Sequence, residues 1–150
     1  MSVWFEGTGE IDCGIEQVER ALDDLGEHHV GVVGLMPGLA NVELVEQGPD
    51  SVVIRTNEGL MTRTNIVTTV AAERVTVEFD EVYEAGSKVT TTSHFLHEFG
   101  ARGSGVTHRL VMSDVEASGL LGFFYRRFGS KKMGNAFLAA YRSYFEESHG

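Results

Sequence analysis

The sequence predicts an α+β protein, in which one seven-stranded antiparallel sheet is combined with two short helices after its first strand and a long C-terminal helix. Residues 15–25 carry apolar side chains at helical spacing, residues 39–113 alternate in short runs between turn signals, and the helical period returns after Ser118. The turns between the later strands are too short for crossover helices, which favours an antiparallel meander. A chain of 150 residues is expected to form a single domain, 1–150.

The first strand is expected over Val3–Gly9 and leads into a helix. Asp12 is the expected N-cap, because its carboxylate can accept a backbone N–H that has no partner in the first turn. The apolar stripe of this helix is Ile15, Val18, Leu22 and Leu25. A second, less regular helix is expected over His28–Met36, and Pro37 ends it because proline cannot continue a helix.

Four strand segments follow, at 39–47, 51–57, 60–69 and 74–84. Turns rich in glycine separate most of them, and Ala85-Gly86-Ser87 ends the last. The segment from Lys88 to Ser113 then reads as a hairpin, with two alternating arms around a Gly-rich turn. Its arms supply the sixth and seventh strands.

Every second residue along each arm of the hairpin is apolar, so these residues line one face of the sheet. The arms are therefore expected to pair in a register that sets Phe99 opposite Val106. The same register sets His97 opposite His108 on the inward face. Two imidazoles on the apolar side of a sheet are unusual, since histidine is only intermediate in its tendency to be buried. They are either hydrogen-bonded core residues or groups that orient a molecule bound against this face.

The strand before the hairpin is expected to pair with its first arm so that Val77 lies opposite Phe95. This register turns Glu81 inward. Either Glu81 is a carboxylate inside the fold, or a β-bulge near Asp80-Glu81-Val82 turns Val82 inward instead. The bulge is favoured, because a carboxylate is almost never fully buried unless it is paired.

The C-terminal segment 120–147 has two apolar sides. One side comprises Met133, Phe137, Ala140, Tyr141 and Tyr144, and the other comprises Leu121, Phe124, Tyr125 and Phe128. Either the helix breaks at Gly129-Ser130, or it is continuous. In the continuous case Phe123, Ser130, Gly134, Phe137 and Tyr141 face the sheet, and Phe124 and Phe128 point elsewhere, for example into the partner of a homodimer.

Composition narrows the classes of function. The net charge is −10, from 12 basic and 22 acidic residues, which argues against nucleic acid and against anionic membrane surfaces as partners. The cluster of Arg126, Arg127, Lys131 and Lys132 is interpreted as a solvated helix face. No apolar run approaches the length of a membrane span, so stable membrane insertion is not expected. The N-terminus does not read as a signal peptide, and a single cysteine, Cys13, fits a cytoplasmic location.

Three segments carry a resemblance to a known family. They are GTGEIDCGIEQVERALDDL, in which a strand enters a helix, LMPGLANVELVEQG, which enters the second strand, and GVTHRLVMSDVEASGLLGFFYRRF, in which the last strand feeds the long helix. With this order of elements the chain resembles the START/Bet v 1-like (SRPBCC) superfamily, in particular its bacterial polyketide cyclase/dehydrase-like and lipid-transport-like members. The resemblance implies the helix-grip fold, in which a curved sheet wraps the C-terminal helix around a mostly apolar cavity.

The resemblance also implies a ligand site, since sites of this kind are concave and largely apolar with a few placed polar groups. Carried over to this chain, its candidate lining is Phe79, Phe95, His97, Phe99, His108, Leu110, Met112, Phe137 and Tyr141. Aromatic and methionine side chains supply apolar area, and methionine adapts to irregular shapes. The Gly-rich segment Gly31–Gly34 departs from the family, in which this helix helps to gate the cavity.

Most catalytic motifs are absent, including a Gly-x-Ser-x-Gly elbow, a phosphate-binding loop and a cysteine pair for zinc. His28 and His29 are interpreted as surface residues, and neither a metal site nor a cofactor is expected. The favoured function is binding of a hydrophobic small molecule or lipid-like ligand. The alternatives are a polyketide cyclase/dehydratase that uses His97, His108 and Tyr141 as acid/base groups, and an adaptor that binds proteins through Phe124 and Phe128.

Overall fold

The computed structural model describes residues 2–86 and 89–148, so Ser87 and Lys88 of the expected turn and hairpin lie outside the described residues. The described chain contains seven strands and four helices. In chain order these are β1 (Val3–Ile11), α1 (Ile15–Ala21), α2 (Leu25–Val33), β2 (Glu43–Gln47), β3 (Val52–Arg55), β4 (Gly59–Ala71), β5 (Arg74–Ala85), β6 (Val89–Arg102), β7 (Gly105–Ala117), α3 (Gly119–Phe128) and α4 (Ser130–Ser148).

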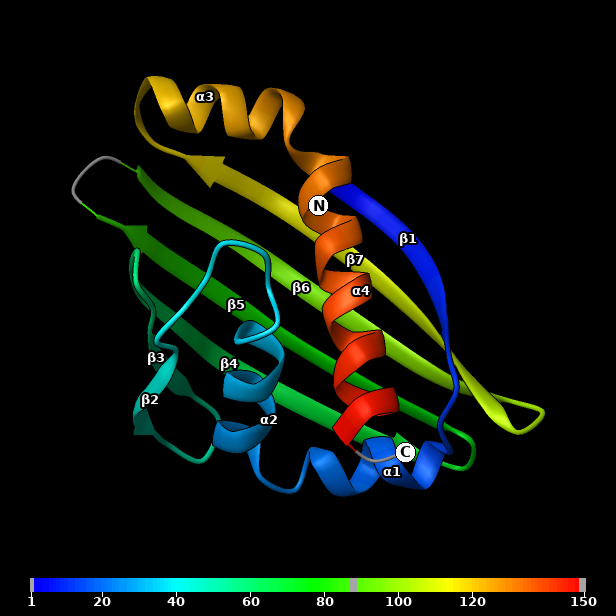
Figure 1. The fold of residues 1–150 in the computed structure, drawn as a ribbon. Coiled ribbons are helices and arrows are strands. Elements are labelled where there is room, and N and C mark those ends of the chain that lie inside the picture. The colour runs from blue at the N-terminus through cyan, green and yellow to red at the C-terminus, as the bar shows by residue number, and fades with distance from the viewer. Residues whose placement is uncertain (1, 87–88, 149–150) are drawn as a thin grey trace.

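The seven strands form one antiparallel sheet in the order β1-β7-β6-β5-β4-β3-β2. Helices α2 and α4 lie over the same face of the sheet, which we call the inner face, and α1 lies near one end of it (Figure 1). Helix α3 lies beyond the opposite end, next to the end of β7 (Figure 1). This arrangement confirms the predicted α+β fold with a curved sheet around the C-terminal helix.

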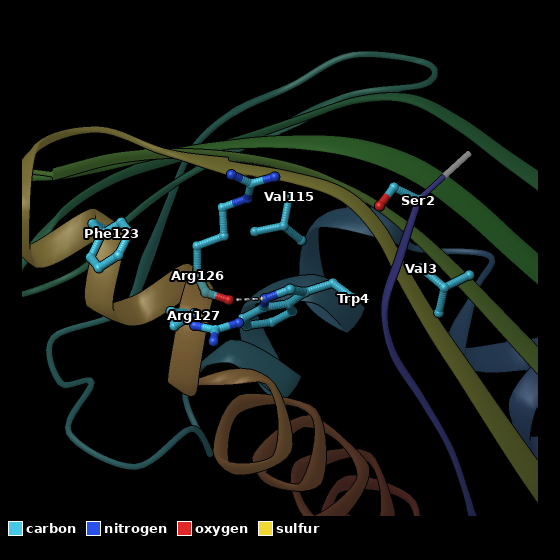
Figure 2. Close-up of a pocket in the computed structure, with 7 residues that line it drawn as sticks. All are labelled: Ser2, Val3, Trp4, Val115, Phe123, Arg126 and Arg127. Atoms are coloured by element: carbon cyan, nitrogen blue, oxygen red, sulfur yellow. Dashed lines mark hydrogen bonds between the residues drawn. The ribbon is translucent and has the colours of Figure 1, made fainter.

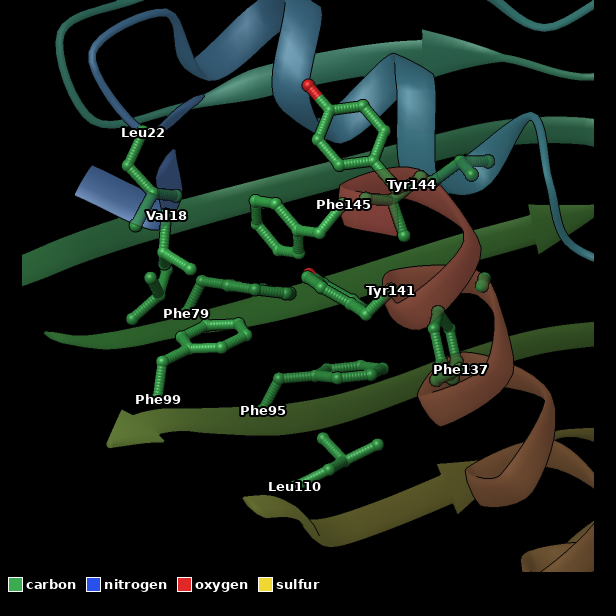
Figure 3. Packing of buried hydrophobic residues seen from close by; sticks show 14 of the residues in the cluster. Val18, Leu22, Phe79, Phe95, Phe99, Leu110, Phe137, Tyr141, Tyr144 and Phe145 are labelled. Carbon is green, nitrogen blue, oxygen red and sulfur yellow. The ribbon is translucent and has the colours of Figure 1, made fainter. Parts of the chain in front are cut away.

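The core lies between the inner face and α4. Alternate residues of the central strands point inward, as the period of two in a strand requires. On β6 the fully buried residues are Phe95, His97 and Phe99. They meet a stripe on α4 that includes Phe137, Tyr141 and Phe145 (Figure 3).

Both predicted registers are wrong by two residues. In the β6–β7 hairpin His108 lies opposite Phe99, and His97 lies opposite Leu110. The reason is the loop, which is reduced to Gly103 and Ser104, with φ 60° at Gly103, a conformation that glycine adopts without strain. A shift of two residues leaves every side chain on its predicted face, so the inward set is unchanged.

The register between β5 and β6 is shifted in the same sense, since Val77 lies opposite His97 instead of Phe95. The bulge expected near Asp80-Glu81-Val82 is also wrong, because the β5–β6 ladder is regular there and Val82 is exposed. The irregularity lies on the neighbouring strand β4, between Thr64 and Val67. Glu81 therefore points inward and is buried.

The first helices differ in detail from the prediction. Gly14, and not Asp12, is the N-cap of α1, and the side chain of Gln17 accepts a hydrogen bond from the Gly14 N–H at 2.9 Å. The backbone N–H of Asp12 donates instead to a carboxylate oxygen of Glu146, at 2.8 Å, which ties the start of α1 to α4. The second helix begins at Leu25, earlier than expected, so the predicted apolar stripe is divided between α1 and α2.

The C-terminal segment breaks at Gly129, as the first of the two alternatives predicted. A side chain at Gly129 would meet the carbonyl oxygen of Tyr125 at 2.7 Å, so glycine suits this position. The break lets α4 bury Phe137 and Tyr141 against the sheet while α3 turns away. Phe124 and Phe128 on α3 are exposed.

Candidate functional site

The nine residues predicted from the sequence as a ligand site come together between the inner face and α4. They come from four elements: Phe79 from β5, Phe95, His97 and Phe99 from β6, His108, Leu110 and Met112 from β7, and Phe137 and Tyr141 from α4. Figure 3 shows several of these rings lying between the strands and α4. No residue of the set is more than 4% exposed.

His97 and His108 form a hydrogen-bonded imidazole pair. Nδ1 of His97 lies 2.9 Å from Nε2 of His108, so one of the two nitrogens carries the proton that the other accepts. The register places the two residues diagonally on neighbouring strands, with their rings stacked at 5.1 Å. The ring of Tyr141 packs against both, at 4.4 Å from His97 and 4.9 Å from His108.

Burial keeps this pair neutral. It lowers the pKa of His97 well below the usual 6.5, and the neighbouring His108 and Arg63 add to the effect. Burial also lowers the pKa of His108, to about 3. It raises the pKa of the Tyr141 hydroxyl to about 12. At neutral pH the centre of the site therefore carries two uncharged imidazoles and an uncharged phenol.

A second polar group, which sequence reasoning missed, lies beside the pair. Arg63 on β4 is 1% exposed, and its Nε donates a hydrogen bond to Oε2 of the buried Glu81 at 2.9 Å. The guanidinium lies over the ring of Phe79, 4.7 Å from its centroid. One guanidinium nitrogen also lies 2.7 Å from Nδ1 of His29, which can accept its proton. Arg63 thus bridges β5 and α2 inside the protein.

The interpretation of His28 and His29 as surface residues is wrong, because both are buried. Helix α2 turns them toward the interior, where His28 packs against Tyr144 and His29 packs edge-on against Phe79. Burial, followed by the nearby charge of Arg63, lowers the pKa of His29 well below its usual value. His29 is therefore neutral, and its Nδ1 accepts a hydrogen bond from the Arg63 guanidinium.

One signal in the sequence could have led to Arg63. The predicted register already turned Glu81 inward, and an inward carboxylate requires a cationic partner. Arg63 is the only basic residue on the adjoining strand β4, where it lies directly opposite Glu81. Pairing these two residues would have removed the reason for a bulge in β5.

Several nitrogen atoms of this interior have no hydrogen-bond partner among residues 2–86 and 89–148. They are Nε2 of His29, Nε2 of His97 and Nδ1 of His108. Buried polar atoms in proteins nearly always have partners, so three such atoms, two on the inner face and one on α2, are a notable departure. Each of these nitrogens could donate or accept one further hydrogen bond.

The interior is closed in this structure. A cavity large enough for a drug-sized ligand would leave free surface on the side chains that line it, and the nine predicted residues have almost none. Their space is filled by one another, as the stacking of Phe79 on Phe95 at 5.0 Å and the contact of Phe95 with Phe137 at 5.1 Å illustrate. Within the described part of the chain no group of three metal-ligating side chains is close enough to hold an ion.

Among the comparisons with known proteins, only the one with solved structures finds matches. No family model matches the sequence, and no curated protein matches it. Solved structures do match. Protein Ms6760 from Mycobacterium smegmatis superposes with a TM-score of 0.64 at 12% identity, over 96% of this chain and 91% of that chain.

Two further structures are similar. A STAR-related lipid transfer protein from Xanthomonas axonopodis has a TM-score of 0.58 at 16% identity, over 92% of this chain and 82% of that one. The lipid transfer and protein localization domain of human StarD13 has a TM-score of 0.54 at 13% identity, over 93% and 75%. The chain thus shares the overall fold of these three structures, and this agrees with the curved sheet around a C-terminal helix that its sequence predicted. At these identities the likeness concerns the fold.

Proposed function

We propose that this protein binds a hydrophobic small molecule or lipid-like ligand between the inner face of the sheet and α4. The observation that carries the proposal is the set of buried imidazole nitrogens without partners on His29, His97 and His108. Each such atom costs about 1–3 kcal/mol when it stays unsatisfied, so a ligand that supplies a hydrogen bond recovers that free energy. Two of the similar structures are named for lipid transfer, which supports an apolar ligand.

The proposed ligand is apolar over most of its length and carries one or two polar groups. Phe79, Phe95 and Phe137 would cover its apolar part, since these three rings lie in contact between the sheet and α4 and aromatic rings supply large apolar area. A hydroxyl, carbonyl or carboxylate would face the His97–His108 pair and Tyr141. A neutral imidazole can either donate or accept a proton, so the pair fits several such groups.

Because the interior is closed, the ligand enters only when α4 or α2 moves away from the sheet. The affinity that is measured then equals the affinity of the open form multiplied by the fraction of molecules that are open. We therefore expect the ligand to bind the free protein with modest affinity and to enter and leave slowly. We place the protein in the cytoplasm, in keeping with its single cysteine, Cys13.

The experiment that tests this proposal begins with protein purified from its own host. Extraction into organic solvent and mass spectrometry should release one apolar compound in an amount comparable with the protein. Binding is then measured with 11-(dansylamino)undecanoic acid, a fluorescent fatty acid. The double variant His97→Leu/His108→Leu keeps the apolar volume and should weaken probe binding about tenfold, because it removes the polar partners.

His94→Asn is the matched control, because His94 lies on the outer face of β6, where it pairs with Asp80 and Glu78. This variant should bind the probe like the natural protein. The proposal fails if no apolar compound is extracted and the probe does not bind. It also fails if the double variant binds the probe with unchanged affinity.

The close contact of His97, His108 and Tyr141 also favours a second candidate, a cyclase/dehydratase in which these residues move protons on a polyketone. We rank it below binding, since an imidazole whose pKa is about 3, as at His108, is a weak base at neutral pH. The two candidates differ in one measurement. For an enzyme, His97→Ala abolishes turnover of a supplied polyketone while the substrate still binds.

A further inference from the structure

The basic residues of this acidic protein are unevenly distributed along the chain. Between Glu116 and Glu146 there are five basic residues and no acidic one, whereas the rest of the chain has 22 acidic and seven basic residues. Four of the five form a basic cluster around the junction of α3 and α4: Arg126, Arg127, Lys131 and Lys132. All four are exposed, and no ion pair among the described residues includes them.

Beside this cluster, α3 exposes its apolar side chains. Leu120, Phe124, Phe128 and Leu121 follow one another within about 100° around the helix, at 100° per residue. Each is at least half exposed, and Phe128 reaches 71%. Helix α3 lies at the end of the sheet away from α1 (Figure 1). The exposed fractions of the four side chains show that the stripe is open to solvent. Contiguous exposed apolar surface of this kind marks an interaction site.

The second half of α3 and the start of β1 line a pocket of about 350 Å³. Figure 2 shows the indole of Trp4 beside Arg127, with its N–H directed at the Arg126 carbonyl oxygen, and the guanidinium of Arg126 near Val115. The indole N–H of Trp4 donates to the carbonyl oxygen of Arg126 at 2.7 Å, and its ring packs on Tyr125 at 5.1 Å. A tryptophan and a tyrosine next to two arginines form a surface that is apolar at its base and cationic at its rim.

We propose that α3 and the basic cluster form a docking surface for an anionic phospholipid bilayer. Phe124 and Phe128 enter the boundary between headgroups and acyl chains, while Arg127, which flanks the apolar stripe at 100° per residue, lies beside the lipid phosphates. Arg126 lies about 160° around the helix from both rings and contributes only its longer-range charge. An interfacial helix combines apolar burial with attraction to anionic lipids in this way. The overall charge of −10 opposes such binding, but charges more than about 8 Å from the surface are largely screened at physiological ionic strength.

The same observations speak against a second copy of the chain as the occupant. A symmetric dimer places the same patch of both copies face to face. Docking through α3 would therefore pair two surfaces that contain no acidic residue between Glu116 and Glu146, so the basic cluster would gain no counter-charge. An anionic bilayer offers acyl chains to the apolar stripe and phosphates to the basic cluster. This proposal does not depend on which ligand the interior binds.

The test uses vesicles of phosphatidylcholine alone and vesicles in which about a third of the lipid is phosphatidylglycerol. The protein should co-sediment with the anionic vesicles only, and added salt should release it. Trp4 is the only tryptophan, so its emission reports on this surface and should shift to shorter wavelength on binding. Arg126→Gln/Arg127→Gln should lower partitioning at least about fivefold, since a basic residue near a membrane contributes about that factor and Arg127 flanks the apolar stripe.

Phe124→Ser/Phe128→Ser should lower partitioning about tenfold or more, because it removes the apolar contact. Two control variants should bind like the natural protein. Arg74→Gln/Arg102→Gln removes the same charge elsewhere, and Val67→Ser/Val70→Ser removes exposed apolar residues from β4.

Four results would overturn the proposal. They are no binding to either vesicle, equal binding to both, sedimentation without a change in Trp4 emission, and a smaller hydrodynamic size of Phe124→Ser/Phe128→Ser without lipid. The last result would assign the surface to a homodimer. None of them depends on probe binding in the interior, so this proposal and the proposed function can fail separately.

Discussion

Mild acid should destabilise this protein, because three buried imidazoles must stay neutral in the folded state. Burial lowers the folded-state pKa of His29, His97 and His108 below the ordinary value of 6.5. In the unfolded chain the same groups take up protons as the pH falls below about 6.5. Their contribution to stability is therefore fully present above this pH and is lost as the pH falls toward the folded-state pKa values.

The loss of unfolding free energy at acid pH follows from the number of protons that the histidines take up on unfolding. A histidine that is protonated only in the unfolded chain costs about 1.4 kcal/mol for each pH unit below its unfolded pKa. At about pH 5 each of the three costs about 2 kcal/mol, and together they cost about 6 kcal/mol. That is comparable with the whole stability of a typical domain, about 5–15 kcal/mol.

One partly exposed histidine, His94, changes stability with pH in the opposite direction. Burial disfavours the charged form of His94, but hydrogen bonds with Asp80 and Glu78 outweigh burial and raise its pKa. A raised pKa contributes stability at low pH that is lost as the pH rises. Because His94 is partly exposed and its partners are on the surface, it offsets only a small part of the loss from the three buried groups.

The assay is urea unfolding at several pH values between about 8 and 5, followed by circular dichroism. The natural protein should lose stability with a slope that approaches three protons at the acid end. His97→Leu/His108→Leu should reduce that slope by about two protons, whereas His94→Asn should keep it. Equal slopes for the natural protein and the double variant would refute the reasoning, and so would a stability that does not change over this range.

Two further predictions concern packing and charge, and urea unfolding at neutral pH measures both. Arg63→Met should cost about 3–5 kcal/mol because it leaves Glu81 buried without a partner, and Arg63→Met/Glu81→Leu should recover most of that loss; a double variant as unstable as the single one would contradict this. Gly134→Ala should cost about 1–3 kcal/mol, since the new Cβ would lie 2.3 Å from ring atoms of Phe5. Gly9→Ala is the matched control, with no atom within 4 Å of the new Cβ, and equal stability of these two variants would disprove the packing argument.

The faces of the strands could be predicted from the sequence, but their exact pairing could not. Alternation fixes which side chains of β5, β6 and β7 point inward, and this information survives any shift by two residues. Phe99 was therefore placed on the correct face even though its partner is His108 and not Val106. Two registers that differ by two residues can be distinguished only by the conformation of the loop. The sequence did not show which residues around Gly103 form that loop.

The buried polar residues were the hardest to predict. Arg63, His28 and His29 belong to types that are usually exposed or only partly buried, and nothing within a few residues of them indicates burial. Their environment is created by distant elements. Arg63 on β4 needs Glu81 from β5 and His29 from α2, and the free energy that makes its burial tolerable appears only when the three meet.

The same polar residues link stability to the proposed function. Apolar side chains at these positions would make the folded protein more stable, because imidazole nitrogens without hydrogen-bond partners cost free energy. Leucine would bury a similar area without that cost. His97→Leu/His108→Leu is therefore expected to be at least as stable as the natural protein at about pH 8, where both imidazoles are neutral in either state. A variant that is more stable yet binds the fatty-acid probe less well would indicate that the imidazoles serve a ligand. A variant that is less stable would instead assign them to the structure of the core, and the argument from unsatisfied nitrogens would no longer hold.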